Sequence, residues 1–322
     1  MQTISAATTE TLLPFDKLIE ALRKMFESGA NAPLRHHHTI PGNNSEEATL
    51  LLMPAWSLKE GFGGVKLVNV NPANNAHNLP GINASYLLFD LESGQHLCLM
   101  DAAILTAKRT AAASALAASY LARPDSSCLL VVGAGKVGSQ MPSAFKHVLP
   151  IQKVLVWSRR QSQREALAEK LFNEGWDAQI PENLEAGVKS ADVISCATFA
   201  TEPVIKGEWL QPGQHIDLVG SFTPTMREVD DDAIAKAKVF IDTPAALVES
   251  GELVIPMKAG VISKDDITAT FYQLCAQKNT AYKTQNQTWR QPQDITLFKG
   301  VGHAVEDLAA AILVYKSIGK TI

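Results

Sequence analysis

The sequence predicts an α/β protein with two domains, one built on a parallel sheet and the other of α+β type. Its 322 residues are enough for one large or two ordinary domains. From Cys128 onward, strands that are apolar along their whole length alternate with helical segments, which is typical of a parallel sheet covered on both faces. Up to residue 122 the chain instead combines a helix with several strand-like runs, which indicates an α+β arrangement.

The α+β part begins with a helix, because apolar residues recur at helical spacing over about 15–28. Strands are expected at 49–56, 64–70, 85–94 and 96–101, and the Ser93-Gly94 turn between the last two suggests a hairpin. Asp101 stands where an N-cap would begin the alanine-rich helix 102–122. Lys108 and Arg109 interrupt this helix, so we expect it to be a buried amphipathic helix and not a membrane span.

In the parallel-sheet part, strands are expected at 128–132, 153–159, 192–198, 215–220 and 239–243. The acidic run 230–232 predicts a helix that begins at Ala233. Residues 301–318 predict a long amphipathic helix, which we expect to pack back on the first domain. The expected organisation is therefore a discontinuous α+β domain, 1–122 with 300–322, and a parallel-sheet domain, 123–299, that starts with the linker 123–127.

Composition excludes several classes of protein. The net charge is −4 and no basic run exceeds Arg159-Arg160, so we expect no nucleic-acid partner. The N-terminus lacks the charged flank and apolar stretch of a signal peptide, and the four cysteines are scattered, so a soluble cytoplasmic protein without disulfides or a membrane span is predicted. The histidines at 36–38 would point to alternate faces of a strand and have no further ligand at suitable spacing, so no metal site is expected.

The glycine-rich turn at 133–138 predicts a dinucleotide-binding site. It follows an apolar strand, precedes a helix, and lies about 20 residues before the next strand, which is the context of the Rossmann fingerprint. Gly133 would allow the tight turn, Gly135 the approach of a pyrophosphate, and Gly138 close packing of the helix on the strand. With these glycines, Ala134, Lys136 and Val137 form the loop that we expect to bind the phosphates at a helix N-terminus.

The end of the second strand predicts which dinucleotide is bound. Ser158, Arg159 and Arg160 stand where an NAD site usually has an acid, and arginines there suit the 2′-phosphate of NADPH, with NADH as the alternative. Thr198 and Ala200 end another strand, and we expect them to border the nicotinamide because ligands bind beyond the carboxyl ends of such strands. For His303, contact with the nicotinamide and simple packing are both open.

Several segments together resemble the ornithine cyclodeaminase/mu-crystallin family. They are PLRHHHTIP (33–41), LMPAW (52–56), GVKLV (64–68), MDAAILTAKRTAAASALA (100–117), VVGAGKVG (131–138), ATFATEPVIKGEWLQPGQHIDLVG (197–220) and GHAVED (302–307). The resemblance implies a Rossmann domain, an α+β substrate-binding domain that dimerises by closing a barrel with its partner, and action on small α-amino or α-imino acids with a nicotinamide cofactor.

The resemblance also implies that Arg35, Lys66 and Arg109 grip the substrate carboxylate and line the reaction centre. Two guanidinium groups can hold a carboxylate in a fixed orientation, and a lysine beside other cations has a lowered pKa that suits a proton donor or relay. Taken by itself, Lys66 is more typical of a solvated lysine at a strand end. Arg109 is unusual because nothing near it in the sequence pairs with it.

One departure from the family pattern points to the reaction. Cyclodeaminases and alanine dehydrogenases of this family place an aspartate where this chain has Phe222, and the next carboxylate is Glu228. We therefore expect NAD(P)H-dependent reduction of a cyclic imino acid, either Δ1-pyrroline-2-carboxylate to proline or Δ1-piperideine-2-carboxylate to pipecolate, with a rate that increases below neutral pH. The alternatives are ornithine or lysine cyclodeamination, reductive amination of a keto acid with ammonia or an alkylamine, and NADPH binding without catalysis.

Overall fold

The computed structural model describes residues 1–42, 47–77, 79–276 and 289–318, and the chain divides into two compact units. Unit 1 consists of Met1–Arg109 and His303–Ile322, and unit 2 of Thr110–Gly302. The sequence placed these limits at 122/123 and 299/300. The first limit of the compact units instead lies inside the helix α3 (Ala102–Leu121), so this helix contributes residues to both units.

Unit 1 is built on a six-stranded sheet with the order β1-β6-β5-β4-β3-β2. Its only parallel pair among the described strands is β1 with β6, and each of the other neighbours is antiparallel. The hairpin predicted around Ser93-Gly94 is confirmed by the pairing of β5 with β6. The strands are β1 (Gln2–Ile4), β2 (His36–Ile40), β3 (Ala48–Ser57), β4 (Phe62–Val70), β5 (Ile82–Asp90) and β6 (His96–Asp101).

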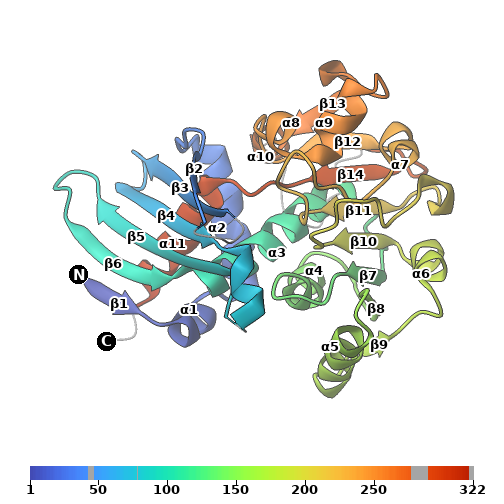
Figure 1. Cartoon of the computed structure of the whole chain (residues 1–322), viewed down its shortest axis with the longest axis horizontal. Helices are drawn as coiled ribbons and strands as arrows, with labels where there is room; N and C mark the ends of the chain where they lie inside the picture. Colours follow the sequence, from blue (N-terminus) through green and yellow to red (C-terminus); the bar gives the residue numbers. More distant parts are fainter. Residues whose placement is uncertain (43–46, 78, 277–288, 319–322) are drawn as a thin grey trace. The chain divides into compact units, whose positions relative to one another are not determined.

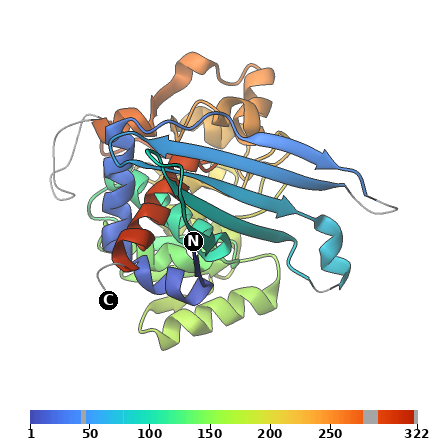
Figure 2. The same ribbon diagram turned by 90° about the vertical axis from the view of Figure 1, so that its left-hand side faces the viewer.

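Helices α2 (Phe15–Ser28) and α11 (Ala304–Ile318) lie side by side against one face of this sheet (Figure 2). The bounds of α2 are those predicted from its apolar spacing, and that apolar stripe is buried. The prediction of an amphipathic α11 is wrong, because all residues from 304 to 312 are buried, Glu306 and Asp307 among them. Unit 1 also contains the helix α1 (Ala6–Leu12) and the 3₁₀ helix η1 (Pro72–His77).

Helix α3 begins as predicted, since Asp101 accepts hydrogen bonds from the backbone N–H groups of Ala103 (3.0 Å) and Ile104 (3.3 Å). It is not amphipathic, however, because nearly all of its side chains are buried or half-buried around the helix. Small alanine side chains allow other elements to approach this helix closely from several directions. An arginine buried within it therefore needs a partner inside the protein.

Unit 2 contains an eight-stranded, wholly parallel sheet, which confirms the α/β class (Figure 1). The order is β13-β12-β14-β11-β10-β7-β8-β9, so the direction in which strands are added reverses between β7 and β10. Ligands of such sheets bind at this reversal, beyond the carboxyl ends of the strands. The strands are β7 (Cys128–Val132), β8 (Lys153–Trp157), β9 (Asp177–Gln179), β10 (Val193–Cys196), β11 (His215–Leu218), β12 (Lys238–Ile241), β13 (Ile267–Thr270) and β14 (Thr296–Lys299).

The helices of unit 2 connect these strands in the order expected of a doubly wound sheet. The predicted acidic start of a helix near Ala233 is confirmed, because Asp230 caps α7 by accepting from Ala233 N at 2.9 Å. The helices are η2 (Gly138–Gln140), α4 (Met141–Lys146), α5 (Gln161–Asn173), α6 (Leu184–Ser190), η3 (Gly207–Trp209), α7 (Asp231–Lys236), α8 (Ala246–Glu249), α9 (Gly251–Lys258), η4 (Lys264–Asp266) and α10 (Phe271–Ala276).

All four cysteines are free thiols in this structure. In the described ranges, no helix combines the length and the hydropathy that a crossing of the bilayer requires. The same residues contain no group of His, Cys, Asp or Glu side chains suited to hold a metal ion.

Candidate functional site

Four charged side chains are buried together in unit 1, and we call Lys66, Arg109, Glu306 and Asp307 the charge cluster. Lys66 lies in the middle of β4, on the face of the sheet that α11 covers, and is 2% exposed. Arg109 comes from α3. Glu306 and Asp307 lie in the first turn of α11, where carboxylates interact favourably with the helix dipole. Three elements distant in sequence therefore supply the cluster.

Asp307 joins the two cations of the charge cluster. Lys66 Nζ donates to Asp307 Oδ1 at 2.9 Å and lies 2.7 Å from Oδ2. Arg109 Nε donates to the same Oδ1 at 2.9 Å, and Arg109 Nη1 donates to Glu306 Oε2 at 2.6 Å. Short charge-assisted hydrogen bonds of this kind fix the orientation of both cations.

Burial and mutual charge set the pKa values in the charge cluster. Burial and the charge of Arg109 lower the pKa of Lys66 to about 8, although Asp307 acts in the opposite direction. Burial alone would raise the pKa of Asp307, but Arg109 and Lys66 hold it below the usual value. Lys66 is therefore a lysine that can give up its proton near neutral pH.

Arg35 and His303 lie close enough to the charge cluster to act on it. The charge of Arg35 contributes to the low pKa of Lys66 and of His303. Burial and Arg35 lower the pKa of His303 to about 4, so this ring is neutral at physiological pH, and its Nδ1 accepts a hydrogen bond from Val305 N. The ring of His303 also packs against Phe26, with centroids 6.1 Å apart. His303 therefore has the packing role that was one of its two expected roles. Its contact with the nicotinamide remains a prediction.

The charge cluster contains two cations, Lys66 and Arg109, and two carboxylates, Glu306 and Asp307, and the charge of Arg35 acts on Lys66. Cations held in fixed positions by buried carboxylates can bind the carboxylate of a ligand. The structure thus brings the three predicted substrate residues into one electrostatic site, while the histidines at 36–38 form the exposed edge strand β2.

The predicted phosphate-binding turn lies in unit 2, at the reversal of strand order. Gly133 has a φ of +110°, and a Cβ there would lie 2.5 Å from Ala197 O. A Cβ at Gly138 would lie 1.8 Å from Gly133 O, so the turn closes on itself at this position. A Cβ at Gly135 would meet nothing within 4 Å. The turn therefore leaves open space at Gly135, on the side where a pyrophosphate would approach the backbone, and its shape fits the expected dinucleotide.

The residues after β8 lie beside the glycine turn, and their role in nucleotide binding remains a prediction. Trp157 O accepts the N–H of Gly133 at 2.9 Å, so the end of β8 lies beside the glycine turn. Ser158 is buried, whereas Arg159 and Arg160 are exposed immediately before α5. Neither guanidinium has an ion-pair partner in the described part of the chain. Two exposed arginines at a helix N-terminus provide donors for a phosphate group.

The loops after β10 and β11 place four residues singled out from the sequence at the same edge. Thr198 and Ala200 follow β10, and Phe222 follows β11. The rings of Phe199 and Phe222 meet edge to face with centroids 6.1 Å apart, and Phe199 is 72% exposed. Glu228 is fully buried, and its carboxylate accepts hydrogen bonds from the backbone of both loops. Glu228 therefore acts as a hydrogen-bond acceptor that connects the two loops.

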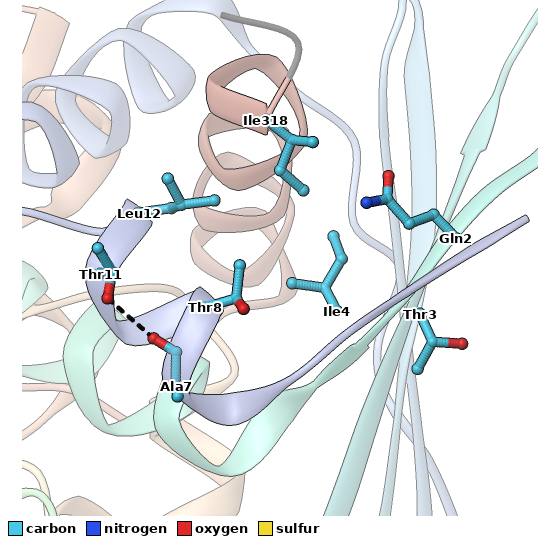
Figure 3. Close-up of a pocket in the computed structure, with 8 residues that line it drawn as sticks. All are labelled: Gln2, Thr3, Ile4, Ala7, Thr8, Thr11, Leu12 and Ile318. Carbon is cyan, nitrogen blue, oxygen red and sulfur yellow. Dashed lines mark hydrogen bonds between the residues drawn. The ribbon is translucent and has the colours of Figure 1, made fainter. Parts of the chain in front are cut away.

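A separate pocket of about 540 Å³ lies in unit 1 and has different chemistry (Figure 3). Its lining contains an amide, threonine hydroxyls and apolar side chains, but no charged group. A small amino or imino acid needs a partner for its carboxylate, so this pocket does not suit that class of ligand. The lining residues are Gln2, Thr3, Ile4, Ala7, Thr8, Thr11, Leu12 and Ile318.

Two residues of the charge cluster escaped the sequence reasoning. Glu306 and Asp307 lie in the segment GHAVED (302–307), in which the sequence predicts no role for either carboxylate. The signal available was Arg109, a charged residue in an alanine-rich helix without a partner near it in sequence. Its partners lie 197 and 198 residues away, and only the fold brings them into contact. The expectation that Lys66 by itself is a solvated lysine is wrong, because Asp307 pairs with it in the interior.

Comparison with known proteins gives consistent results over the whole chain. The model of the ornithine cyclodeaminase/mu-crystallin family matches residues 1–321. An uncharacterised protein of Schizosaccharomyces pombe is 42% identical over 328 residues, which cover 99% of this chain and 98% of that protein. The Δ1-pyrroline-2-carboxylate reductase of Paracoccus denitrificans is 38% identical over 288 residues, 86% of this chain and 88% of that enzyme. The structure of the Thermococcus litoralis Δ1-pyrroline-2-carboxylate reductase with NADH and L-proline matches with a TM-score of 0.92 and 32% identity, and covers 100% of this chain and 98% of that one.

We predict that Asp307→Asn shifts the pH dependence of anion binding. Asp307 raises the pKa of Lys66, so its removal lowers that pKa below about 8 and Lys66 loses its charge at lower pH. In the wild type, affinity for furan-2-carboxylate, which has no titrating imine, should be constant below about pH 8 and fall by up to about tenfold per pH unit above it. Calorimetric titration over a pH series should show this decrease beginning at lower pH in Asp307→Asn.

The control for this experiment is Glu60→Gln, which removes an exposed carboxylate of unit 1 that pairs with Lys316. This variant should retain the wild-type pH profile. An unchanged profile in Asp307→Asn would contradict the electrostatic coupling between Asp307 and Lys66.

We predict that only one of two alanine substitutions in the glycine turn lowers stability. Gly138→Ala places a methyl group against Gly133 O, so the turn must rearrange and the melting temperature should fall by several degrees. Gly135→Ala places its methyl group in open space and should leave the melting temperature nearly unchanged. If Gly135→Ala nevertheless weakens dinucleotide binding at least tenfold, the open space is where the phosphates bind; wild-type affinity in this variant would refute that assignment.

Proposed function

Because the chain belongs to the ornithine cyclodeaminase/mu-crystallin family, we propose that it reduces a cyclic α-imino acid, with Δ1-pyrroline-2-carboxylate to L-proline as the leading reaction. Its relatives make the chain an NAD(P)H-dependent oxidoreductase of the imine-reductase type. The six-membered Δ1-piperideine-2-carboxylate is a second substrate of the same chemistry. Proline metabolism in the cytoplasm is the corresponding cellular setting.

The observation that carries this proposal is the pair of buried cations Lys66 and Arg109, which Asp307 holds together and on which the charge of Arg35 acts. The substrate carboxylate would bind Arg35 and Arg109. Arg109 is held in one orientation by Glu306 and Asp307, so its remaining donors are presented in a fixed direction. Binding through a rigid guanidinium fixes the position of the α-carbon next to that carboxylate.

The residues of the charge cluster also account for the proton that the reduction consumes. When bound, the reduced nicotinamide supplies a hydride, and the balanced reaction takes up one hydride at the imine carbon and one proton at the nitrogen. Lys66, with a pKa of about 8, is protonated at neutral pH and keeps the imine nitrogen protonated. Asp307 holds the Lys66 ammonium in place at 2.9 Å.

NADPH is the proposed cofactor, with NADH as the alternative. Arg159 and Arg160 are exposed and follow β8, where a 2′-phosphate is recognised in Rossmann domains. The glycine turn from Gly133 to Gly138 would hold the pyrophosphate, and Thr198 and Ala200 would border the nicotinamide. The relative from Thermococcus litoralis was solved with NADH, so the arginines are the feature that distinguishes the two cofactors here.

A homodimer is the proposed assembly. The face of the unit 1 sheet opposite α11 carries apolar side chains that remain partly exposed, such as Leu67 (39%), Ile40 (44%) and Trp56 (36%). An apolar sheet face of this kind is usually covered by a partner. A second copy of the same sheet would cover it, as the family resemblance implies.

We predict rapid oxidation of NAD(P)H when Δ1-pyrroline-2-carboxylate is added, with L-proline as product and no ammonia released from ornithine in the presence of NAD⁺. Arg109→Lys retains the charge but loses the planar donor group, so it should lower kcat/KM by about a hundredfold. Absorbance at 340 nm and chiral amino-acid analysis measure both outcomes. Ammonia release from ornithine would instead indicate a cyclodeaminase, and activity only in the presence of ammonia or methylamine with a keto acid would indicate reductive amination.

We predict that Arg159→Ala and Arg160→Ala weaken NADPH binding selectively. Loss of one charge-assisted contact to a phosphate should raise the dissociation constant for NADPH by about ten- to a hundredfold and leave that for NADH within about twofold. Lys170→Ala is the matched control, since it removes an exposed cation from the C-terminal end of the same helix. Equal effects of the arginine substitutions on both cofactors would show that the 2′-phosphate is not recognised there.

A further inference from the structure

We infer that Glu228 is a positioning residue for the nicotinamide cofactor, because its buried carboxylate ties together the two loops that follow β10 and β11. The inference rests on the proposed cofactor site at this edge of the unit 2 sheet. Glu228 itself touches neither the substrate nor the cofactor in this assignment. It acts by holding Thr198, which borders the proposed nicotinamide position.

The carboxylate of Glu228 accepts three hydrogen bonds from the two loops. Oε1 accepts hydrogen bonds from Thr198 N and from Thr198 Oγ1, both at 2.8 Å. Oε2 accepts from Gly220 N at 2.8 Å. Since β10 and β11 are adjacent parallel strands, with Cys196 paired to Leu218, Thr198 and Gly220 each lie two residues beyond the end of their strand. One side chain therefore fixes the separation of the two strand ends.

Hydrogen bonds to the carboxylate of Glu252 in α9 fix the backbone at Glu228. Glu252 Oε2 accepts the N–H of Glu228 at 2.7 Å, and Oε1 accepts the N–H of Val229 at 2.9 Å. Ser221 Oγ donates to the same carboxylate at 2.9 Å, so the loop after β11 is attached to it as well. The backbone of Glu228 is fixed in place by these contacts, and its side chain can act as a rigid clamp.

The loops after β10 and β11 lie so close together that no side chain fits at Gly220. A Cβ at Gly220 would lie 2.0 Å from Thr198 O and 2.4 Å from Glu228 Oε1. On the other side, a Cβ at Gly133 would lie 2.5 Å from Ala197 O and 3.3 Å from Thr198 Cγ2. A displacement of Thr198 therefore changes contacts at the glycine turn, so the clamp acts on the whole dinucleotide-binding edge.

The negative charge of the clamp has a nearby counter-charge. Lys299 on β14 is buried, donates to Leu218 O at 2.9 Å, and lies close enough to Glu228 for that carboxylate to raise its pKa against the effect of burial. Glu252, Asp242 and Asp217 act on Lys299 in the same way, so this lysine is a counter-charge shared by four buried carboxylates.

The test is Glu228→Gln, which has the same shape but one acceptor oxygen in place of two. The amide group can accept from Thr198 or from Gly220, and its NH₂ then faces the other donor. We expect the dissociation constant for NADPH, measured by quenching of tryptophan fluorescence, to rise about ten- to a hundredfold. Affinity for furan-2-carboxylate should remain unchanged, and Glu228→Asp, with a shorter reach, should show the same selective loss.

The matched control is Asp230→Asn, two residues further along the chain. Asp230 accepts from Ala233 N and Gly207 N, both at 2.9 Å, so this variant also weakens a carboxylate with two backbone donors. It should lower the melting temperature and retain wild-type affinity for NADPH. If Glu228→Gln lowers the melting temperature as Asp230→Asn does and binds NADPH like the wild type, Glu228 is merely structural and the inference is overturned.

Binding measurements separate this inference from the proposed reaction, because they need no turnover. Selective loss of NADPH affinity in Glu228→Gln supports the clamp even if Δ1-pyrroline-2-carboxylate is not reduced, and only the substrate assignment then fails. A wild-type protein that binds neither NADPH nor NADH would overturn the inference.

Discussion

The buried pairing of Asp307 with Lys66 and Arg109 is the interaction on which the unit 1 site depends. It connects β4, α3 and α11, three elements that are far apart in the sequence, through a single carboxylate. Removing one partner of a buried ion pair typically costs about 3–5 kcal/mol, because the remaining charge stays in the interior. The same pairing fixes the side-chain orientation of both cations, so stability and the proposed ligand recognition rely on the same three residues.

The sequence predicted the local structure well and the charge pairing poorly, for a physical reason. Apolar spacing gave the bounds of α2, and the glycine turn was placed correctly after β7, because both features are set by residues close together in the chain. The partner of Arg109 could not be predicted in this way, since it lies on the last helix. The prediction that α3 and α11 are amphipathic was wrong. Alanine-rich helices that are buried on nearly all sides need no polar face.

The sequence also did not predict several short strands. β14 was not predicted, although it lies between β11 and β12 in the middle of the parallel sheet. Its four residues include Lys299, and a charged residue is not expected in a central strand. The structure explains this residue, because Glu228 and other buried carboxylates lie near it. The burial of Lys299 in this strand depends on tertiary charge interactions that neither strand propensity nor apolar alternation reports.

The distribution of acids among the two units bears on the type of reaction. Glu306 and Asp307 are engaged with cations, and Glu228 accepts three hydrogen bonds, so these carboxylates already have defined partners. Phe222 stands where the family resemblance leads us to expect an aspartate in cyclodeaminases, and its ring packs on Phe199. In the charge cluster, burial and Arg109 lower the pKa of Lys66 to about 8. Oxidation, ring closure and re-reduction of a diamino acid require protons to be moved at several steps, whereas imine reduction consumes one proton at one nitrogen. A site with a single titrating lysine beside fixed guanidinium groups matches the simpler requirement.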